Sequence, residues 1–339
     1  MKAPVACLLV ALGLACGSDE ETTARGSGHA GGGHGAGHGG RGMGHGGRAE
    51  HGGAPRPEPL ARVARLGDGR PGPLRPGQTL DATATLSTGA ERLVLDLREG
   101  ARVELEPGSL ARLGEEAPAE LLLARGHVHA VLPPVGNSPR PPLRIGTPAG
   151  TVEIGGSGDL WITVRSDGTA WVALLGGRAS VLTGETDEAT GTERRLDLTP
   201  ARAVVVGRTL EEPTEGPTTL AAARAMGVAL AEGAEEAELE DALAAAVGAL
   251  DAALDTLAAE RQRGQEVQRR HRAAVSAMDP RAATIMQELV AHGRALDAAR
   301  DLLLTRFERA RAIALLASGE GGDPTAVRRP RVRAALGLD

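Results

Sequence analysis

Five histidines near the N-terminus are the residues of this chain best suited by type to bind a metal ion. They all lie within residues 26–53, a stretch that also contains 15 glycines. Neutral imidazole is a common ligand for zinc, nickel and copper ions, but the irregular spacing argues against a preformed site. Two interpretations stay open, a solvated spacer or a weak buffer for Zn, Ni or Cu, and no other cofactor is expected. The five residues are His29, His34, His38, His45 and His51.

A cysteine at the end of a short apolar leader is the second residue with evident chemistry. Lys2 precedes a mostly apolar run over residues 3–15, which is typical of a secretory leader and too short to cross the ~30 Å hydrocarbon core of a bilayer. Residues 12–16, Leu-Gly-Leu-Ala-Cys, resemble a bacterial lipoprotein signal. The resemblance implies removal of residues 1–15, lipidation of Cys16 and sorting to the outer membrane, facing the periplasm. Ordinary leader cleavage is the alternative.

The composition argues against several other kinds of chemistry. Lys2 is the only lysine, so a chain without the leader has none for a P-loop or a Schiff base. Cys7 and Cys16 are the only cysteines, so thiol catalysis and thiolate metal sites are not expected. A net charge of -6 and three aromatic residues offer neither the basic surface nor the stacking rings that nucleic-acid binding requires. We expect a protein that is not an enzyme and binds no nucleic acid.

Three polar or aromatic motifs in the middle of the chain have both a functional and a structural interpretation. Residues 155–159, Gly-Gly-Ser-Gly-Asp, depart from a nucleophile elbow, because aspartate replaces its last glycine and a strand is expected on each side. His127 and His129 would lie on one face of a strand, close enough to share a metal ion, yet no third ligand is evident. Solvent-facing histidines at an edge or on an outer face are the favoured interpretation. Trp161 and Trp171 are expected to pack in the core or on the surface.

The elements that would position these residues begin with a β region over residues 59–208. Short apolar alternations separated by turn residues predict half-buried strands without intervening helices. Ser166-Asp167-Gly168 between two apolar runs is typical of a β-hairpin, because Asp-Gly accommodates the positive φ of a tight turn. About ten short strands predict an all-β sandwich or roll. They are residues 93–97, 103–105, 121–124, 127–132, 143–145, 151–154, 160–164, 170–174, 181–182 and 203–206.

The order of motifs in this region resembles the FecR domain, an extracytoplasmic β module of bacterial envelope regulators. The family's threonine, glycine and strand pattern is matched by Thr88-Gly89 and residues 93–97, and its Thr-Pro-small-Gly motif by residues 147–150. Gly176-Gly177 follow the closing strand. The resemblance covers less than half of the chain and implies a β domain that recognises something. The family's control of a sigma factor requires an inner-membrane segment and a cytoplasmic region, neither of which is evident, so that role is not expected here.

The last third of the sequence is rich in Ala, Leu, Glu and Arg and predicts helices. We expect helices over residues 220–232 and 235–278 and a third that ends at residue 316, with Asp279-Pro280 as its N-cap and first position. Apolar residues at a 3-4 spacing predict that the two long helices form an antiparallel coiled hairpin. This hairpin either packs on the β region and on itself, or serves as a partner-binding or dimerising arm. The arginines that follow it are expected in a solvated tail, or in contact with an acidic polymer: Arg328, Arg329, Arg331 and Arg333.

The sequence thus predicts six segments and a binding function. The function expected is that of a non-enzymatic cell-envelope lipoprotein, anchored in the membrane by its lipid, whose FecR-like domain binds, senses or scaffolds an unknown envelope protein or polymer. The hairpin could also form a homo-oligomer. The alternative is a periplasmic metal-binding or buffering protein. The segments are a signal peptide (1–15), a disordered tether (16–58), the FecR-like domain (59–208), a linker (209–219), the α-helical hairpin region (220–318) and an Arg-containing tail (319–339).

Overall fold

The computed structural model describes ten stretches of the chain, which together contain most of the predicted β region and most of the predicted helices. These are residues 61–66, 74–81, 84–97, 100–114, 119–134, 140–187, 192–207, 210–231, 239–319 and 329–336. Cys16, the five N-terminal histidines, the predicted leader and the predicted tether lie outside the described residues.

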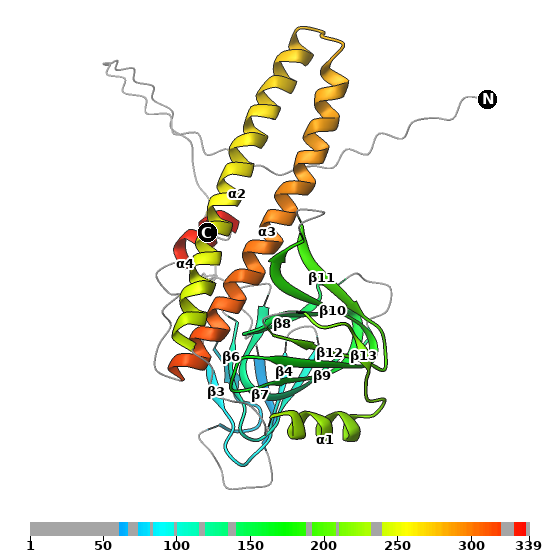
Figure 1. Ribbon diagram of the computed structural model, residues 1–339, viewed down its shortest axis with the longest axis vertical. Coiled ribbons are helices and arrows are strands. Elements are labelled where there is room, and N and C mark those ends of the chain that lie inside the picture. Colours follow the sequence, from blue (N-terminus) through cyan, green and yellow to red (C-terminus); the bar gives the residue numbers. More distant parts are fainter. Residues whose placement is uncertain are drawn as a thin grey trace, which may run out of the picture. The chain divides into compact units, whose positions relative to one another are not determined.

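Within these residues, strands come first in the chain and helices follow (Figure 1). The strands are β1 (Ala61–Leu66), β2 (Thr79–Leu80), β3 (Thr85–Ser87), β4 (Leu93–Leu97), β5 (Arg102–Leu105), β6 (Leu110–Leu113), β7 (Ala119–Leu132), β8 (Leu143–Thr147), β9 (Gly150–Val164), β10 (Ala170–Thr186), β11 (Glu193–Leu198), β12 (Arg202–Val206) and β13 (Thr214–Glu215). The helices are α1 (Leu220–Ala231), α2 (Leu239–Ser276), α3 (Ala282–Ser318) and α4 (Arg329–Leu336). A large sheet of many strands, followed by helices, confirms the general order that the sequence predicts.

The described strands belong to one sheet that closes on itself at one place. Its main order is β13-β12-β10-β9-β8-β7-β5-β4-β1-β2, with β11 on β10, and β6 between β3 and β7. One end of β7 pairs with β8 and the other end pairs with β9, while β8 and β9 also pair with each other. Every described pairing of named strands is antiparallel except that between β7 and β8. This closed circuit of three strands gives the sheet a roll-like part.

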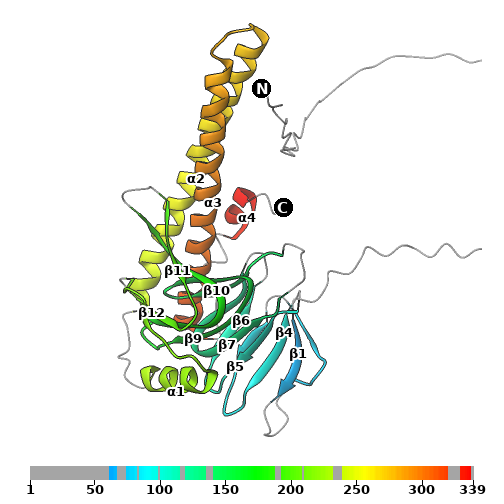
Figure 2. The same ribbon diagram turned by 90° about the vertical axis from the view of Figure 1, so that its right-hand side faces the viewer.

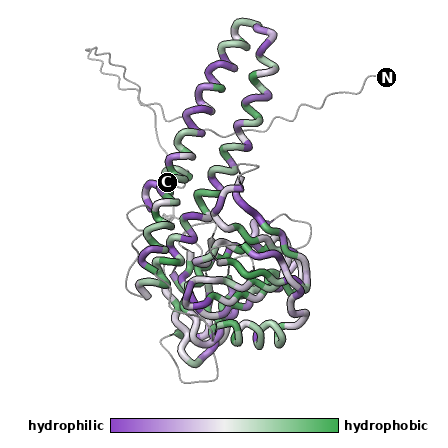
Figure 3. The backbone as a smooth tube through the Cα atoms, in the orientation of Figure 1, coloured by the Kyte–Doolittle hydropathy of each residue, from purple (hydrophilic) through white to green (hydrophobic). Residues whose placement is uncertain are grey.

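The main apolar core lies on one face of the strands and follows their alternation. In β4, Leu93, Leu95 and Leu97 are buried, whereas Val94 and Asp96 between them are partly exposed. The same period of two continues into β5, where Val103 and Leu105 are buried. Figure 3 shows hydrophobic positions in the strands of the sheet, in α1 and in the part of the hairpin beside the sheet. Burial of this face stabilises the sheet, because removing apolar area from water is the dominant favourable contribution to folding.

The prediction of short separate strands is wrong for β7, β9 and β10. Each is one long strand where the sequence predicts two. Glycines that the pattern assigns to turns form β-bulges instead, and the register of β10 against β9 shifts on both sides of Gly177, whose φ is 80°. A Cβ atom there would lie 2.2 Å from the carbonyl oxygen of Ser157. Because glycine tolerates this φ and this close approach, the strand bends and continues.

Six further strands, β1, β2, β3, β6, β11 and β13, are absent from the sequence-based prediction. β11 reads Glu-Arg-Arg-Leu-Asp-Leu, and only its last residue, Leu198, is buried. Charged residues interrupt the apolar alternation that identifies a half-buried strand. Its pairing with β10 supplies the backbone hydrogen bonds that stabilise it, so the tertiary contact and not the local pattern produces this strand.

Helix α1 packs its small residues against tryptophan side chains of the sheet (Figures 1 and 2). Ala223 and Gly227, four residues apart, are its buried positions. They lie over a cluster that contains Trp161 and Trp171. Both tryptophans are nearly inaccessible, which confirms the prediction that they pack and do not form an open platform.

Gly227→Ala is expected to loosen α1 although alanine is the better helix former. The added Cβ atom would lie 2.4 Å from Thr163 Oγ1 and 2.5 Å from Trp161 Nε1, so overpacking should cost about 1–3 kcal/mol. Thermal unfolding and the tryptophan emission maximum measure this, and a red shift is expected as Trp161 becomes exposed. Gly248→Ala in α2 is the matched control, since nothing lies within 4 Å of its Cβ position, and it should be neutral or stabilising. An equal response of both variants would contradict the prediction.

Helices α2 and α3 form an antiparallel hairpin. Arg270 pairs with Glu288 at 2.8 Å, and Glu260 lies 3.3 Å from a ring nitrogen of His292, so each pair joins positions on either side of the connecting turn. The turn differs in detail from the prediction. Asp279 is not the N-cap, because α3 begins at Ala282, three residues later. The Asp279 carboxylate instead accepts a hydrogen bond from the backbone N–H of Arg281 at 2.8 Å, within the turn.

The predicted solvated arginine tail contains a helix, α4, that packs on the hairpin. Val332 and Leu336 are buried, and they join the apolar cluster of the hairpin that includes Leu250 and Phe307. The arginines of this segment suggest a solvated chain, yet the apolar pair four residues apart forms a stripe on one helical face. The expectation of a fully solvated tail is therefore wrong for residues 329–336.

Of the described helices, α2 is long and apolar enough to cross a membrane by length and composition. Fewer than a quarter of the residues in its most apolar stretch are buried inside the protein. Leu250, Leu254 and Leu257 are buried in the cluster that α2 forms with α3 and α4. These buried residues form the seam of the hairpin.

Candidate functional site

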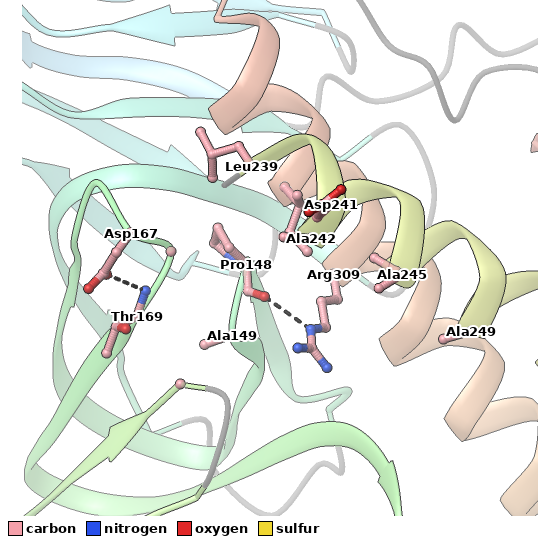
Figure 4. Close-up of a pocket in the computed structure, with 14 residues that line it drawn as sticks. Pro148, Ala149, Asp167, Thr169, Leu239, Asp241, Ala242, Ala245, Ala249 and Arg309 are labelled. Atoms are coloured by element: carbon pink, nitrogen blue, oxygen red, sulfur yellow. Dashed lines mark hydrogen bonds between the residues drawn. The ribbon is translucent and has the colours of Figure 1, made fainter. Parts of the chain in front are cut away.

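A cavity of about 660 Å³ lies where the turns of the sheet meet the two long helices (Figure 4). Its walls come from the β8–β9 turn, the β9–β10 turn, the end of β12, the first turns of α2 and the C-terminal half of α3. The volume lies within the range of roughly 300–1,000 Å³ that small-molecule pockets occupy. The lining residues are Pro148, Ala149, Asp167, Gly168, Thr169, Gly207, Leu239, Asp241, Ala242, Ala245, Ala246, Ala249, Arg309 and Ile313.

Arg309 is the cation of this cavity. Its Nε–H donates to the carbonyl oxygen of Pro148 at 3.1 Å and an Nη1–H donates to that of Thr183 at 3.2 Å. Burial lowers the pKa of Arg309, and Glu185 opposes this effect. No carboxylate in the described part of the chain forms an ion pair with Arg309. The guanidinium therefore keeps N–H donors that could bind an anionic group.

Two carboxylates, those of Asp167 and Asp241, add negative charge to the lining of the cavity. Asp167 accepts a hydrogen bond from the backbone N–H of Thr169 at 2.8 Å and lies 3.4 Å from Arg165. Asp241 lies in the first turn of α2, where a negative charge interacts favourably with the helix dipole. Alanines of α2 form the cavity wall beside these groups, and Figure 4 labels Ala242, Ala245 and Ala249 among them. The site thus combines one cation, two anions and a small apolar wall.

The segment of α3 next to the cavity is held on the sheet by a buried charged pair. Arg144 donates from Nε to one carboxylate oxygen of Glu308 at 3.3 Å and from Nη2 to the other at 3.2 Å. The Thr151 hydroxyl also donates to Glu308, and Arg144 forms a second ion pair with Glu153. Burial opposes the charge on Arg144, yet Glu308 and Glu153 raise its pKa above the ordinary value. This buried pair joins α3 to β8 of the sheet.

A second arginine of α3 ties three elements together. Arg306 donates from Nε to the carbonyl oxygen of Gly184 in β10 at 2.9 Å, and from Nη1 to that of Ala249 in α2 at 3.0 Å. Burial lowers the pKa of Arg306, which Glu193 opposes. Through these contacts, Arg144, Arg306 and Arg309 fasten the C-terminal half of α3 to the strands.

Glu193 is a titratable group at this junction with a strongly shifted pKa. Its carboxylate accepts a hydrogen bond from the backbone N–H of Gly184 at 3.1 Å. Burial raises the pKa of Glu193 to about 7, against the opposing effects of Thr305, Gly184 and Arg144. Burial also raises the pKa of Asp301 on α3. The attachment of α3 to the sheet therefore includes carboxyl groups that resist ionisation.

The structure places His127 and His129 on one face of β7, as predicted, but not in solvent. His127 is buried with Nδ1 3.0 Å from Thr163 Oγ1, and burial lowers its pKa. His129 lies 2.8 Å from Asp159 and 3.5 Å from Glu104. The interpretation as solvent-facing residues of an edge is wrong, because β7 pairs on both sides within the sheet. Among the described residues, no group of three or more His, Cys, Asp or Glu could hold a metal ion.

Helix α1 explains this burial. Arg224 of α1 lies over the ring of Trp161, 5.6 Å from its centroid, and pairs with Glu106 at 2.7 Å. Arg92 pairs with the same glutamate at 3.0 Å from another side. The histidines thus belong to a polar layer between the sheet and α1, whose charges are paired. This layer holds a helix in place and leaves the cavity at the hairpin as the candidate site.

Sequence reasoning did not find Arg144, Glu308 or Arg309. The available signal was the C-terminal half of α3, in which residues 302–315 are apolar on more than one face although the hairpin seam requires only one. A helix apolar on several faces is buried on several sides. The charges among these apolar residues could then have been predicted to need buried partners.

The chain has few similarities to known proteins. No known family model matches the sequence, and no curated protein matches it. Two crystal structures of a candidate anti-sigma factor from Parabacteroides distasonis are similar in part, each with 15% sequence identity and a TM-score of 0.32. The match covers 40% of this chain and 61% of that chain. A TM-score of this size does not establish a shared fold.

Proposed function

We propose that this chain is a non-enzymatic cell-envelope lipoprotein whose FecR-like β region binds a small charged ligand and communicates binding to the helical hairpin. The observation that carries the proposal is the double role of Arg309. It lines the cavity and also fastens α3 to the carbonyl oxygens of Pro148 and Thr183. An anionic group that binds the guanidinium would compete with these two bonds. Occupancy would then change the contact between sheet and hairpin, as a sensing module requires.

The resemblance to the FecR domain supports this choice of site. Residues 147–150, which match the most recognisable motif of that family, form the β8–β9 turn, and Pro148 and Ala149 line the cavity. The lining consists mainly of small side chains that can surround a ligand without reacting with it. Because the cavity carries charges of both signs, the ligand class that fits is a small zwitterion, such as an amino acid or a short peptide end.

Ligand binding is tested by the thermal unfolding of the full chain in the presence of glycine, alanine, dialanine or acetate. A compound that binds the folded cavity should raise the unfolding temperature of the wild type as its concentration rises. Ala245→Phe fills the cavity wall and is the matched control, in which the shift should disappear. An equal shift in both proteins, or none with any compound, would contradict binding at this cavity.

The proposed anchor is tested separately. Protein purified from its native membrane is compared with Cys16→Ala by intact mass and detergent partitioning. An acylated N-terminus at Cys16 in the detergent phase is expected, and the variant should lack the acyl mass. An unmodified, detergent-insensitive wild type would leave a secreted binding module in place of a lipoprotein.

The alternative function as a metal buffer rests on the histidines of residues 26–53. Zinc or nickel titration of the full chain, beside a version without residues 26–53, distinguishes it from the ligand-binding function. Metal uptake that disappears with the deletion would favour the buffer. Equal, negligible uptake by both proteins would reject it.

A further inference from the structure

The end of the hairpin around the turn between α2 and α3 exposes apolar side chains to solvent. We define the hairpin tip as residues 261–294. Its large exposed apolar residues are Val275, Met278, Met286 and Val290. Figure 3 shows hydrophobic and hydrophilic positions alternating along this part of the hairpin. The described hydrogen bonds and ion pairs of the tip remain within α2, α3, their turn and α4, so no strand covers these side chains.

Met278 occupies its position against two local preferences. Its side chain is 92% exposed, and its φ of 54° lies in the left-handed region, which glycine and asparagine tolerate best. The residue lies in the turn two positions after the end of α2, and the N–H of the next residue, Asp279, donates to the carbonyl oxygen of Ala274 at 2.9 Å. Glycine or asparagine at this position would remove both the backbone strain and the exposed apolar area. The folded chain alone therefore provides no reason for methionine here.

The charge of the tip is opposite to that of the whole chain. The tip contains seven arginines and three carboxylates, a net charge of +4, whereas the chain carries -6. Arg269, Arg272 and Arg281 all belong to the exposed residues near the turn. Arginine binds phosphate groups strongly because its guanidinium can donate two parallel hydrogen bonds. A surface that combines an arginine surplus with exposed apolar side chains matches an anionic, phosphate-bearing partner with an apolar interior.

We propose that the hairpin tip docks on the surface of an anionic lipid bilayer. Met278 and Val275 enter the boundary between headgroups and acyl chains, and the arginines of the last turns of α2 contact the lipid phosphates. Apolar side chains of an interfacial helix reach ~5–10 Å into this boundary, and Met278 follows Arg272 and Arg269 in the chain by about 1.7 and 2.5 helical turns. The tip has no aromatic residue for base stacking, so its chemistry favours lipid over nucleic acid.

This inference goes beyond the proposed function and does not rest on it. The cavity and Cys16 lie outside residues 261–294. The protein used in the test carries Cys16→Ser, so it has no acyl group that could bind the membrane. Failure of tip docking would leave ligand binding and the lipid anchor unaffected.

The experiment is co-sedimentation of the full chain carrying Cys16→Ser with vesicles. One vesicle preparation contains equal parts of phosphatidylcholine and phosphatidylglycerol, and the other contains phosphatidylcholine alone. Binding to the anionic vesicles is expected to exceed binding to the neutral ones and to weaken as salt is raised. Met278→Asn should reduce the affinity roughly tenfold, since asparagine retains the left-handed turn but cannot bury apolar area. Arg269→Gln with Arg272→Gln should reduce it roughly fivefold per arginine.

Matched control variants distinguish loss of specific binding from misfolding and from nonspecific binding to vesicles. Met226→Asn removes an exposed methionine of α1, and Arg178→Gln with Arg202→Gln removes two exposed arginines of the β region. Both controls should bind as the wild type does. Equal binding to the two vesicle types, wild-type binding by the tip variants, or equal losses in tip and control variants would overturn the proposal. Tighter binding to double-stranded DNA than to the anionic vesicles would overturn it as well.

Discussion

Glu308→Gln is expected to lower the free energy of unfolding by about 3 kcal/mol, because it leaves the buried guanidinium of Arg144 without its bidentate partner. Both side chains are almost inaccessible in the wild type. Glutamine retains the shape of glutamate, so the loss reports the missing charge and not a cavity. Arg144 keeps Glu153, which places the effect at the lower end of the range for broken buried pairs.

Urea unfolding followed by circular dichroism and tryptophan fluorescence measures this effect. Glu288→Gln is the matched control, since it breaks a helix–helix pair with Arg270 in which both side chains are about half exposed, and it should cost less than about 0.5 kcal/mol. The double variant Arg144→Met with Glu308→Leu should be more stable than Glu308→Gln, because it removes both buried charges together. A Glu308→Gln protein as stable as the Glu288→Gln protein would show that the pair does not hold α3 on the sheet.

Glu193→Gln is expected to change how stability depends on pH. The folded state holds the Glu193 proton up to a pKa of about 7, while the unfolded state releases it near 4.5. Between these values the folded state binds more protons, so the wild type loses stability as pH rises from about 4.5 to 7. The raised pKa corresponds to a loss of about 3 kcal/mol above pH 7. Glutamine cannot ionise, so the variant should exceed the wild type in stability at pH 8 and match it near pH 5.

Urea unfolding of both proteins at several pH values between 5 and 8 measures the difference. Both proteins retain Asp301, but because its charge also raises the pKa of Glu193, the difference between the proteins includes this interaction. Glu212→Gln changes an exposed glutamate and is the matched control, whose stability should stay within about 0.5 kcal/mol of the wild type at every pH. A difference between Glu193→Gln and the wild type that does not grow with pH would refute the assigned environment of Glu193.

Local patterns in the sequence were sufficient for the elements whose stability is local. The alternation of Leu93, Leu95 and Leu97 identifies β4, and the Asp167-Gly168 turn identifies the β9–β10 hairpin, because each depends on residues close in the chain. The long helices follow from strong helix formers and a repeating apolar stripe. The candidate site was not predictable in this way, since its charged residues come from elements far apart in the sequence.

What the sequence by itself determined was the order of the parts, with strands first and an antiparallel pair of long helices after them. Only the tertiary structure decided that β10 continues through Gly177, that Val332 packs on the hairpin, and that Arg144 meets Glu308 across more than 160 residues. The physical reason is that backbone hydrogen bonding and apolar periodicity act over a few residues. Ion pairs, close approach at glycine and cavity walls depend on which surfaces meet, and packing alone brings those surfaces together.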